Sequence, residues 1–377
     1  MKKWKKWLIL PVLIGILLYS GEVLAAEGID EYDYTEIQQY LDETLADSDI
    51  RFQDMLSSLL TGNFSEAFSQ IGQMAKSALL SEVKTNQTVL HQVLMIGLFG
   101  ALLTQIASAL SKNGVGEAGF YVTYLLLMAL LLVAFQTSVS IGSQVIGRLL
   151  NFMSVVIPVF FAAVAFAGGS MSALAFYELI LLIISVVQWL FLNILLPMIE
   201  VYVTLLLVNS LSKEDYLSRL AELLKSILNW LLKTLLGVVV GLNLVQGLVL
   251  PMVDSVKSAT VRKAISAIPW IGKGGDAVAS VLLGSGALIK NGIGMAALVF
   301  LVLLCLVPLI KLSIISVLYQ GSAAAIQPVS DPRIVACISS VYEGTKLVLK
   351  LVLYTLILFV VSVAIICAAS NSNYYAG

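Results

Sequence analysis

The sequence has little charge and almost no histidine. Only 12% of its 377 residues are charged, 59% are hydrophobic, and His91 is the single histidine. This composition lies far outside the range of soluble globular domains, so we expect most of the chain to fold in lipid. A lone histidine also argues against a metal centre or acid–base catalysis, because both need several converging groups.

Cysteines and catalytic motifs are equally scarce. The three cysteines, Cys305, Cys337 and Cys367, are far apart and form no C-x-x-C pair, so the sequence contains no disulfide framework. It holds neither a P-loop nor a G-x-S-x-G motif. A net charge of -1 is without the excess of positive charge that is typical of nucleic-acid-binding proteins. We therefore expect a protein that is not an enzyme, binds no cofactor or metal and has no nucleic-acid partner.

Residues 1–26 have the pattern of a secretory signal peptide. Four lysines within residues 1–6 precede an apolar stretch over 7–18, and small residues follow just before Glu27. An uncleaved first membrane anchor is the alternative interpretation. In both cases the lysines stay in the cytoplasm and Glu27 emerges on the far side of the membrane.

Residues 27–88 are predicted to form an exported acidic helical head. They hold twelve acidic residues against three basic ones, and their apolar residues recur at helical spacing. A segment of this size makes only a very small independent core. We expect the head to pack on the membrane surface or on a partner.

Residues 89–377 are predicted to be an all-α, polytopic transmembrane helical bundle. A span needs roughly 20 predominantly apolar residues. About seven stretches qualify: 90–110, 119–141, 149–168, 174–208, 227–250, 294–318 and 347–369.

Four parts of this membrane domain depart from a simple span. The stretch 174–208 is too long for one ordinary span and holds Pro197, which permits either one broken helix or two tight passes. Residues 211–226 are predicted to be an amphipathic helix in the interface plane. Residues 254–292 are predicted to be a basic, glycine-rich cytoplasmic loop, within which 277–289 is too short to span and is interpreted as re-entrant.

Ionisable residues inside the predicted spans are the sharpest functional signal. Such groups are costly in hydrocarbon and normally face a cavity or a partner, and Glu178, Glu200 and Lys311 are of this kind. Glu200 and Lys311 each follow a proline by three residues, and we hypothesise a contact between them, within the fold or across a subunit interface. The alternative is that Lys311 extends to the interface while Glu200 bonds locally.

A small-residue strip in the predicted fifth span is interpreted as a packing motif. Gly237 and Gly241 are four residues apart and would lie on one face of the helix. Such strips allow helices to approach closely in membranes.

Several segments together resemble the stage III sporulation protein AE family of endospore-forming bacteria. They are Leu217–Lys225, 246–247, 254–257, 288–294, 308–311 and 323–334, in that order, after a signal peptide and an acidic head. The resemblance covers nearly the whole chain. Its most specific residues are Lys290, Asn291, Gly294, Gln327, Pro328, Asp331 and Arg333.

The resemblance implies a membrane platform or conduit subunit of the secretion-like channel complex between mother cell and forespore. It implies a multi-pass protein of the mother-cell membrane that surrounds the forespore. Its partners would be the other proteins of the stage III sporulation A operon, including the ATPase and ring-forming members, and, directly or through them, stage II sporulation protein Q of the forespore. No catalytic residue is implied.

A self-contained secondary transporter for a small solute is the alternative function. The motif at 112–118 resembles that at 290–296, and both precede an apolar span. Internal repeats and broken helices of this kind occur in transporters. The residues alone support the two functions about equally. The family resemblance favours the platform or conduit subunit.

Overall fold

The computed structural model describes residues 115–166, 172–212, 214–266 and 275–371, with a few isolated positions before them. These residues form helices and short connections and contain no strand, which confirms the all-α prediction. The predicted signal peptide, acidic head and first span (90–110) lie outside the described residues, apart from those isolated positions. The elements are α5 (Val115–Phe166), α6 (Ser172–Leu190), η3 (Phe191–Leu195), α7 (Leu196–Leu211), α8 (Ser218–Ser266), α9 (Gly275–Ile326) and α10 (Pro332–Asn371).

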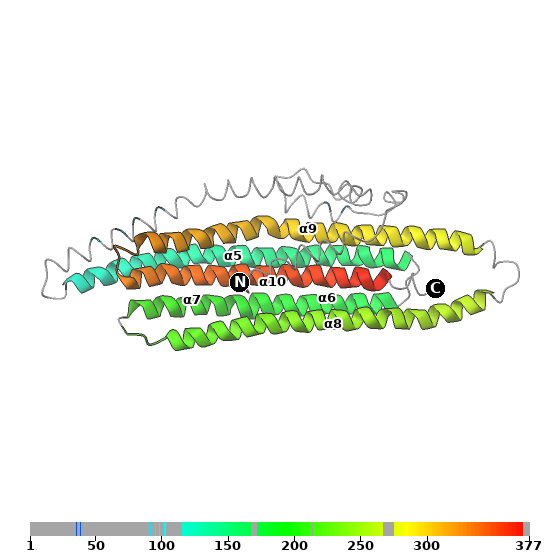
Figure 1. The fold of residues 1–377 in the computed structure, drawn as a ribbon, viewed down its shortest axis with the longest axis horizontal. Coiled ribbons are helices and arrows are strands. Elements are labelled where there is room, and N and C mark those ends of the chain that lie inside the picture. The colour runs from blue at the N-terminus through cyan, green and yellow to red at the C-terminus, as the bar shows by residue number, and fades with distance from the viewer. Residues whose placement is uncertain are drawn as a thin grey trace, which may run out of the picture.

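The helices run back and forth along one elongated bundle (Figure 1). Five of them are long and apolar enough, by length and composition, to cross a membrane. The short connections from Leu211 to Ser218 and from Ile326 to Pro332 lie at the same end, which we call the turn end. Phe120, near the start of α5, is also at the turn end, because the Arg333 guanidinium lies 3.5 Å from the centre of its ring.

The helices are much longer than the spans that hydropathy predicts. The predicted spans 119–141 and 149–168 are one helix, α5, of 52 residues. The stretch between them includes Gly142 and Gly147 but no proline, and Gly142 lies against Val348 on α10. Just before it, the buried Ser138 accepts a hydrogen bond from Thr345 Oγ1 on α10 at 3.4 Å. A helix that is already nucleated continues through such a stretch at little cost. At 1.5 Å per residue, α5, α8, α9 and α10 are about 60 to 80 Å long.

Two further predictions differ from the structure. The predicted interfacial helix 211–226 is instead divided: α7 ends at Leu211, and α8 begins at Ser218 and continues directly through the fifth predicted span. The predicted loop 254–292 is helical except for 267–274, which lie outside the described residues, and the predicted re-entrant stretch 277–289 is part of α9. Gly284, Gly286 and Gly292 lie inside α9, so glycines among apolar residues do not end this helix.

The second pass through the bundle is one helix with a π-helical turn. Residues 172–211 run as α6, η3 and α7 without a break in helical structure, so this stretch makes one pass and not two. In η3 the backbone N–H of Leu196 donates to the Phe191 carbonyl, five residues earlier. Pro197, which has no N–H to donate, follows immediately, and a π-turn accommodates such a local interruption of the hydrogen-bond ladder.

Helix α10 lies at the centre of the bundle, in contact with α5, α7, α8 and α9 (Figure 1). The core around it is filled by large apolar and aromatic side chains, among them Tyr124, Phe152, Phe300 and Phe359, all fully buried. The buried polar residues of the described chain are all serines or threonines. Several of them donate to a carbonyl of their own helix, as Thr355 does to Leu351, so they add no buried charge.

Candidate functional site

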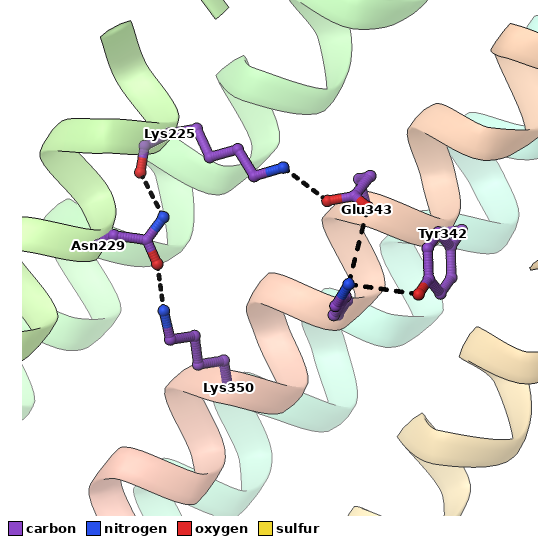
Figure 2. Close-up of polar contacts among 6 residues, drawn as sticks. Lys225, Asn229, Tyr342, Glu343 and Lys350 are labelled. Atoms are coloured by element: carbon purple, nitrogen blue, oxygen red, sulfur yellow. Dashed lines mark hydrogen bonds and ion pairs between the residues drawn. The ribbon is translucent and has the colours of Figure 1, made fainter. Parts of the chain in front are cut away.

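Helices α8 and α10 meet along a seam of charged and polar side chains (Figure 2). Lys225 Nζ on α8 donates to Glu343 Oε2 on α10 at 2.7 Å, and Lys346 Nζ lies 3.8 Å from Glu343 Oε1. One turn further along, Asn229 Nδ2 donates to the Lys225 carbonyl at 2.7 Å. Lys350 Nζ donates to Asn229 Oδ1, so the seam joins the two helices at two levels.

Tyrosine rings accompany the lysines of this seam. Lys346 Nζ donates to Tyr342 Oη at 3.3 Å. The ammonium groups of Lys225, Lys346 and Lys350 lie 5.9, 5.1 and 5.7 Å from the ring centres of Tyr202, Tyr342 and Tyr354, respectively. A cation over an aromatic face is attracted by the ring quadrupole, more strongly where water is scarce. The seam is therefore a partly shielded cluster of cations around a single carboxylate among the described residues.

Two of the residues predicted from sequence lie at the same level as the seam. Glu343 and Lys350 are about 17 and 27 Å from the turn end, counted along α10 from Pro332 at 1.5 Å per residue. Glu200, eleven residues before the end of α7, and Lys311, fifteen residues before the end of α9, fall about 17 and 22 Å from the turn end. We call this level the polar belt; its members are Glu200, Lys225, Lys233, Lys311, Glu343, Lys346 and Lys350.

The structure does not join Glu200 to Lys311 among its described contacts. Both side chains are half-buried, and the Glu200 carbonyl accepts a hydrogen bond from Thr204 Oγ1 at 2.9 Å. Glu200 is on α7 and Lys311 is on α9, and α10 packs against both helices (Figure 1). A pair across a subunit interface stays a prediction. Glu178 is on α6, on the other side of η3, and its side chain is outside the described residues.

The glycine residues predicted from sequence fall into two kinds of environment. A Cβ at Gly237 or Gly241 on α8 would meet nothing within 4 Å, so the predicted packing strip contacts no described part of its own chain. A Cβ at Gly294 on α9 would overlap Cys367 Sγ and lie 3.3 Å from Phe160 Cε2. Gly294 is therefore a point where α5, α9 and α10 approach closely. Lys290 and Asn291 belong to α9, and their side chains are outside the described residues.

The remaining family-like residues build the turn end. Asp331 caps α10, because its Oδ1 accepts the backbone N–H of Arg333 at 2.8 Å and Pro332 occupies the first helical position. The Arg333 guanidinium also bonds both carboxylate oxygens of Asp331, at 3.2 Å each, while lying over Phe120. Gln327 and Pro328 are exposed in the turn after α9. This motif holds α10 against α5.

The other connection at the turn end is organised by Asn209 and Asp215. Asn209 Nδ2 donates to Asp215 Oδ1 at 2.7 Å, Asn209 Oδ1 accepts the Leu217 N–H at 2.7 Å, and Ser218 Oγ donates to Asp215 Oδ2 at 2.8 Å. The hydrogen bonds from Asn209 and Ser218 lower the pKa of the Asp215 carboxyl. These bonds fix the entry to α8 and so the position of Lys225 two turns later.

The seam was missed by sequence reasoning, although a signal was present. Lys225 was placed in an interfacial helix, and Glu343 and Lys346 lie just outside the predicted span 347–369. Glu343, Lys346 and Lys350 are spaced three and four residues apart, and Lys225 and Asn229 are four residues apart, so each set lies on one helical face. The described residues hold no group of three or more potential metal ligands. The seam can bind anions and join helices, but it contains no nucleophile–base arrangement.

Comparisons with known proteins agree with the residues described above. The family model for stage III sporulation protein AE matches residues 50–370. The chain is 24% identical to the stage III sporulation protein AE of Bacillus subtilis (strain 168) over 296 residues, which cover 78% of this chain and 74% of that protein. No solved structure matches. Because the family model covers most of the sequence, the chain belongs to the stage III sporulation protein AE family and has a role in sporulation.

Proposed function

We propose that this protein is a membrane platform or conduit subunit of the secretion-like channel complex between mother cell and forespore. It would sit in the mother-cell membrane around the forespore, with its acidic head exported. There it would bind the other proteins of the stage III sporulation A operon, including the ATPase and the ring-forming members. Contact with stage II sporulation protein Q would be direct or through those rings.

The observation that carries this proposal is the length of the bundle. Helices of about 60 to 80 Å are at least twice the roughly 30 Å of a bilayer core, so a large part of the bundle extends beyond the hydrocarbon. A protein that only moves a small solute needs no such extension. A rigid bundle that projects from the membrane offers surface on which other subunits can assemble.

The filled core supports a role that depends on partners. The described interior is lined by apolar residues, serines and threonines, and the charged residues of the polar belt lie towards its edge. Transporters commonly place ionisable groups between helices at the membrane midplane. In the proposed complex a conduit would therefore form between subunits and not through the middle of one described bundle.

The first test is recovery of partners from sporulating cells. The tagged chain is extracted in a gentle detergent during engulfment, captured, and its companions are identified by mass spectrometry. Another tagged multi-pass protein of the same membrane serves as the control. We expect the operon proteins and the forespore partner to be enriched with this chain only.

The autonomous transporter remains the competing proposal, supported by the π-turn and Pro197 in the second pass. It predicts a stable, monodisperse chain recovered alone, and solute flux in vesicles that contain only this protein. Flux that is lost in Glu200→Gln but retained in Arg219→Gln, an exposed residue of the turn end, would favour the transporter over the platform.

A further inference from the structure

Four of the five passes through the bundle carry an uncharged stretch of similar length on the same side of the polar belt. In α8 it runs from Lys233 to Asp254, in α9 from Lys311 back to Lys290, and in the second pass from Glu200 back to Glu178. In α10 no charge follows Lys350. All four stretches point away from the turn end. Helix α5 has no residue in the belt: its Gly142 is level with Val348 and Val352 of α10, so the exposed Arg148 lies about 9 Å beyond Lys350, and its long side chain can extend back to the boundary.

These stretches match one bilayer. Each contains about 20 residues, which is the number that a spanning helix needs to cross roughly 30 Å of hydrocarbon. They are side by side, because the helices that carry them pack in one bundle (Figure 1). The polar belt then lies at one boundary of the hydrocarbon, and the part of the bundle between the belt and the turn end lies outside it.

The seam between α8 and α10 has the composition of a membrane boundary. Lysines whose apolar stems lie along a helix and whose ammonium groups reach the surface are typical of this level, and so are tyrosines. Lys346 exposes 55% of its side chain and Lys225 39%, so their charges are within reach of the surroundings. Lys225 and Lys346 both approach the carboxylate of Glu343, so two ammonium groups share one carboxylate among the described contacts, and this leaves an excess of positive charge. Lys350 donates to the neighbouring Asn229 Oδ1.

We propose that the α8–α10 seam binds the phosphate group of an anionic phospholipid at the edge of a bilayer that covers only the part of the bundle beyond the polar belt. Lys346 and Lys350 supply the charge on α10. Lys225, held by Glu343 over Tyr202, supplies it on α8. The phosphate compensates the excess charge, and the acyl chains lie against the exposed apolar residues of α8, which include Val238 and Leu242.

Lipid retention tests the site. The purified chain is exchanged into detergent with phosphatidylglycerol or phosphatidylcholine, and the bound lipid is counted by native mass spectrometry. Lys346→Gln with Lys350→Gln should reduce retained phosphatidylglycerol about tenfold or more, since each lysine near an anionic lipid surface contributes a factor of about five. Arg219→Gln at the turn end is the matched control, and Lys346→Arg with Lys350→Arg should retain the lipid.

Equal retention of phosphatidylglycerol in the glutamine variant and the wild type would overturn the proposal. Displacement of the lipid by millimolar inorganic phosphate would also overturn it, because a site for free phosphate does not need acyl chains. Preference for phosphatidylglycerol over phosphatidylcholine that persists with phosphate present would support it.

A depth measurement tests the bilayer position without touching the seam. Val317 on α9 is 67% exposed and lies between the belt and the turn end, whereas Leu242 on α8 is 44% exposed and lies in an uncharged stretch. In sealed and opened vesicles, a membrane-impermeant maleimide should label Val317→Cys and spare Leu242→Cys, with the unsubstituted chain as background. Shielding of both positions, or labelling of both, would contradict the assigned boundary.

Discussion

Helices α10 and α8 are both long, apolar and joined by the same charged seam, yet their surroundings differ sharply. Half of the most apolar window of α10 is buried inside the chain, against 17% of that of α8. Gly344 on α10 lies against Val203 and Phe135, while a Cβ at Gly237 or Gly241 on α8 would meet no atom of the described residues within 4 Å. The same kind of small residue therefore marks internal packing on one helix and an outward face on the other.

Adding a methyl group at Gly344 should have the largest effect. Its Cβ would overlap Val203 Cγ2 and lie 2.8 Å from Phe135 Cε2, in the middle of the core. We expect Gly344→Ala to lower the free energy of unfolding by about 1 to 3 kcal/mol, the usual cost of overpacking. Thermal unfolding in detergent measures this, and an unchanged midpoint would show that the centre of the bundle is loosely packed.

Breaking the seam between the two helices should have a moderate effect. The Lys225 and Glu343 side chains are 39% and 30% exposed, so their pairing is partly screened. We expect Lys225→Met or Glu343→Gln to destabilise the chain by about 1 kcal/mol or less. A double-mutant cycle should show coupling between the two positions. Strictly additive effects would show that the ion pair does not stabilise the packing of α8 against α10.

The hypothesised Glu200–Lys311 pair should show no coupling within a single chain. α10 packs against both helices, and no described ion pair joins Glu200 to Lys311. The same cycle applied to Glu200→Gln and Lys311→Met in monomeric, detergent-solubilised protein should be additive within about 0.5 kcal/mol. If the pair forms between copies, the combined charge reversal should restore sporulation that each single reversal abolishes; failure to restore it would discard the hypothesis.

Alanine on the outward face of α8 should have the smallest effect, of opposite sign. In the part of the chain that the structure describes, nothing within 4 Å would obstruct a methyl group at Gly237 or Gly241, and alanine is favoured over glycine inside a helix by about 0.5 to 1 kcal/mol. Gly237→Ala should therefore leave the unfolding midpoint unchanged or raise it. A clear loss of sporulation in a variant of unchanged stability would identify this face as a contact with another chain.

The all-helical class and the membrane environment follow from composition and hydropathy. In lipid, a long uncharged stretch can satisfy the hydrogen bonds of its backbone N–H and C=O groups within itself only as a helix. The ends of the helices do not follow from composition or hydropathy. Hydropathy ends a helix where polarity rises, as at 136–148 in α5, but the backbone continues because nothing there breaks the hydrogen-bond ladder. The positions of Asp331 and Arg333 were found through the family resemblance, and only the structure shows that they cap α10.

The charged seam was beyond sequence reasoning for a related reason. Each of its residues is unremarkable alone, and they come together because Gly344 and its neighbours set how α10 lies among the other helices. Glu200 and Lys311 were recognised because they interrupt predicted spans, yet the packing of the bundle decides which charges meet. Spacing along one helix predicts a shared face; it does not identify the helix opposite.

Site-specific photocrosslinking in sporulating cells tests the platform account most directly. A photoreactive amino acid is placed at outward positions, Trp230 on α8 and Val122 on α5, and at the buried Val352 on α10 as the control. The account predicts adducts with other stage III sporulation A proteins from the outward positions and none from Val352. Outward positions that yield no protein adduct during engulfment, in cells where the chain is present and folded, would contradict a platform on which other subunits assemble.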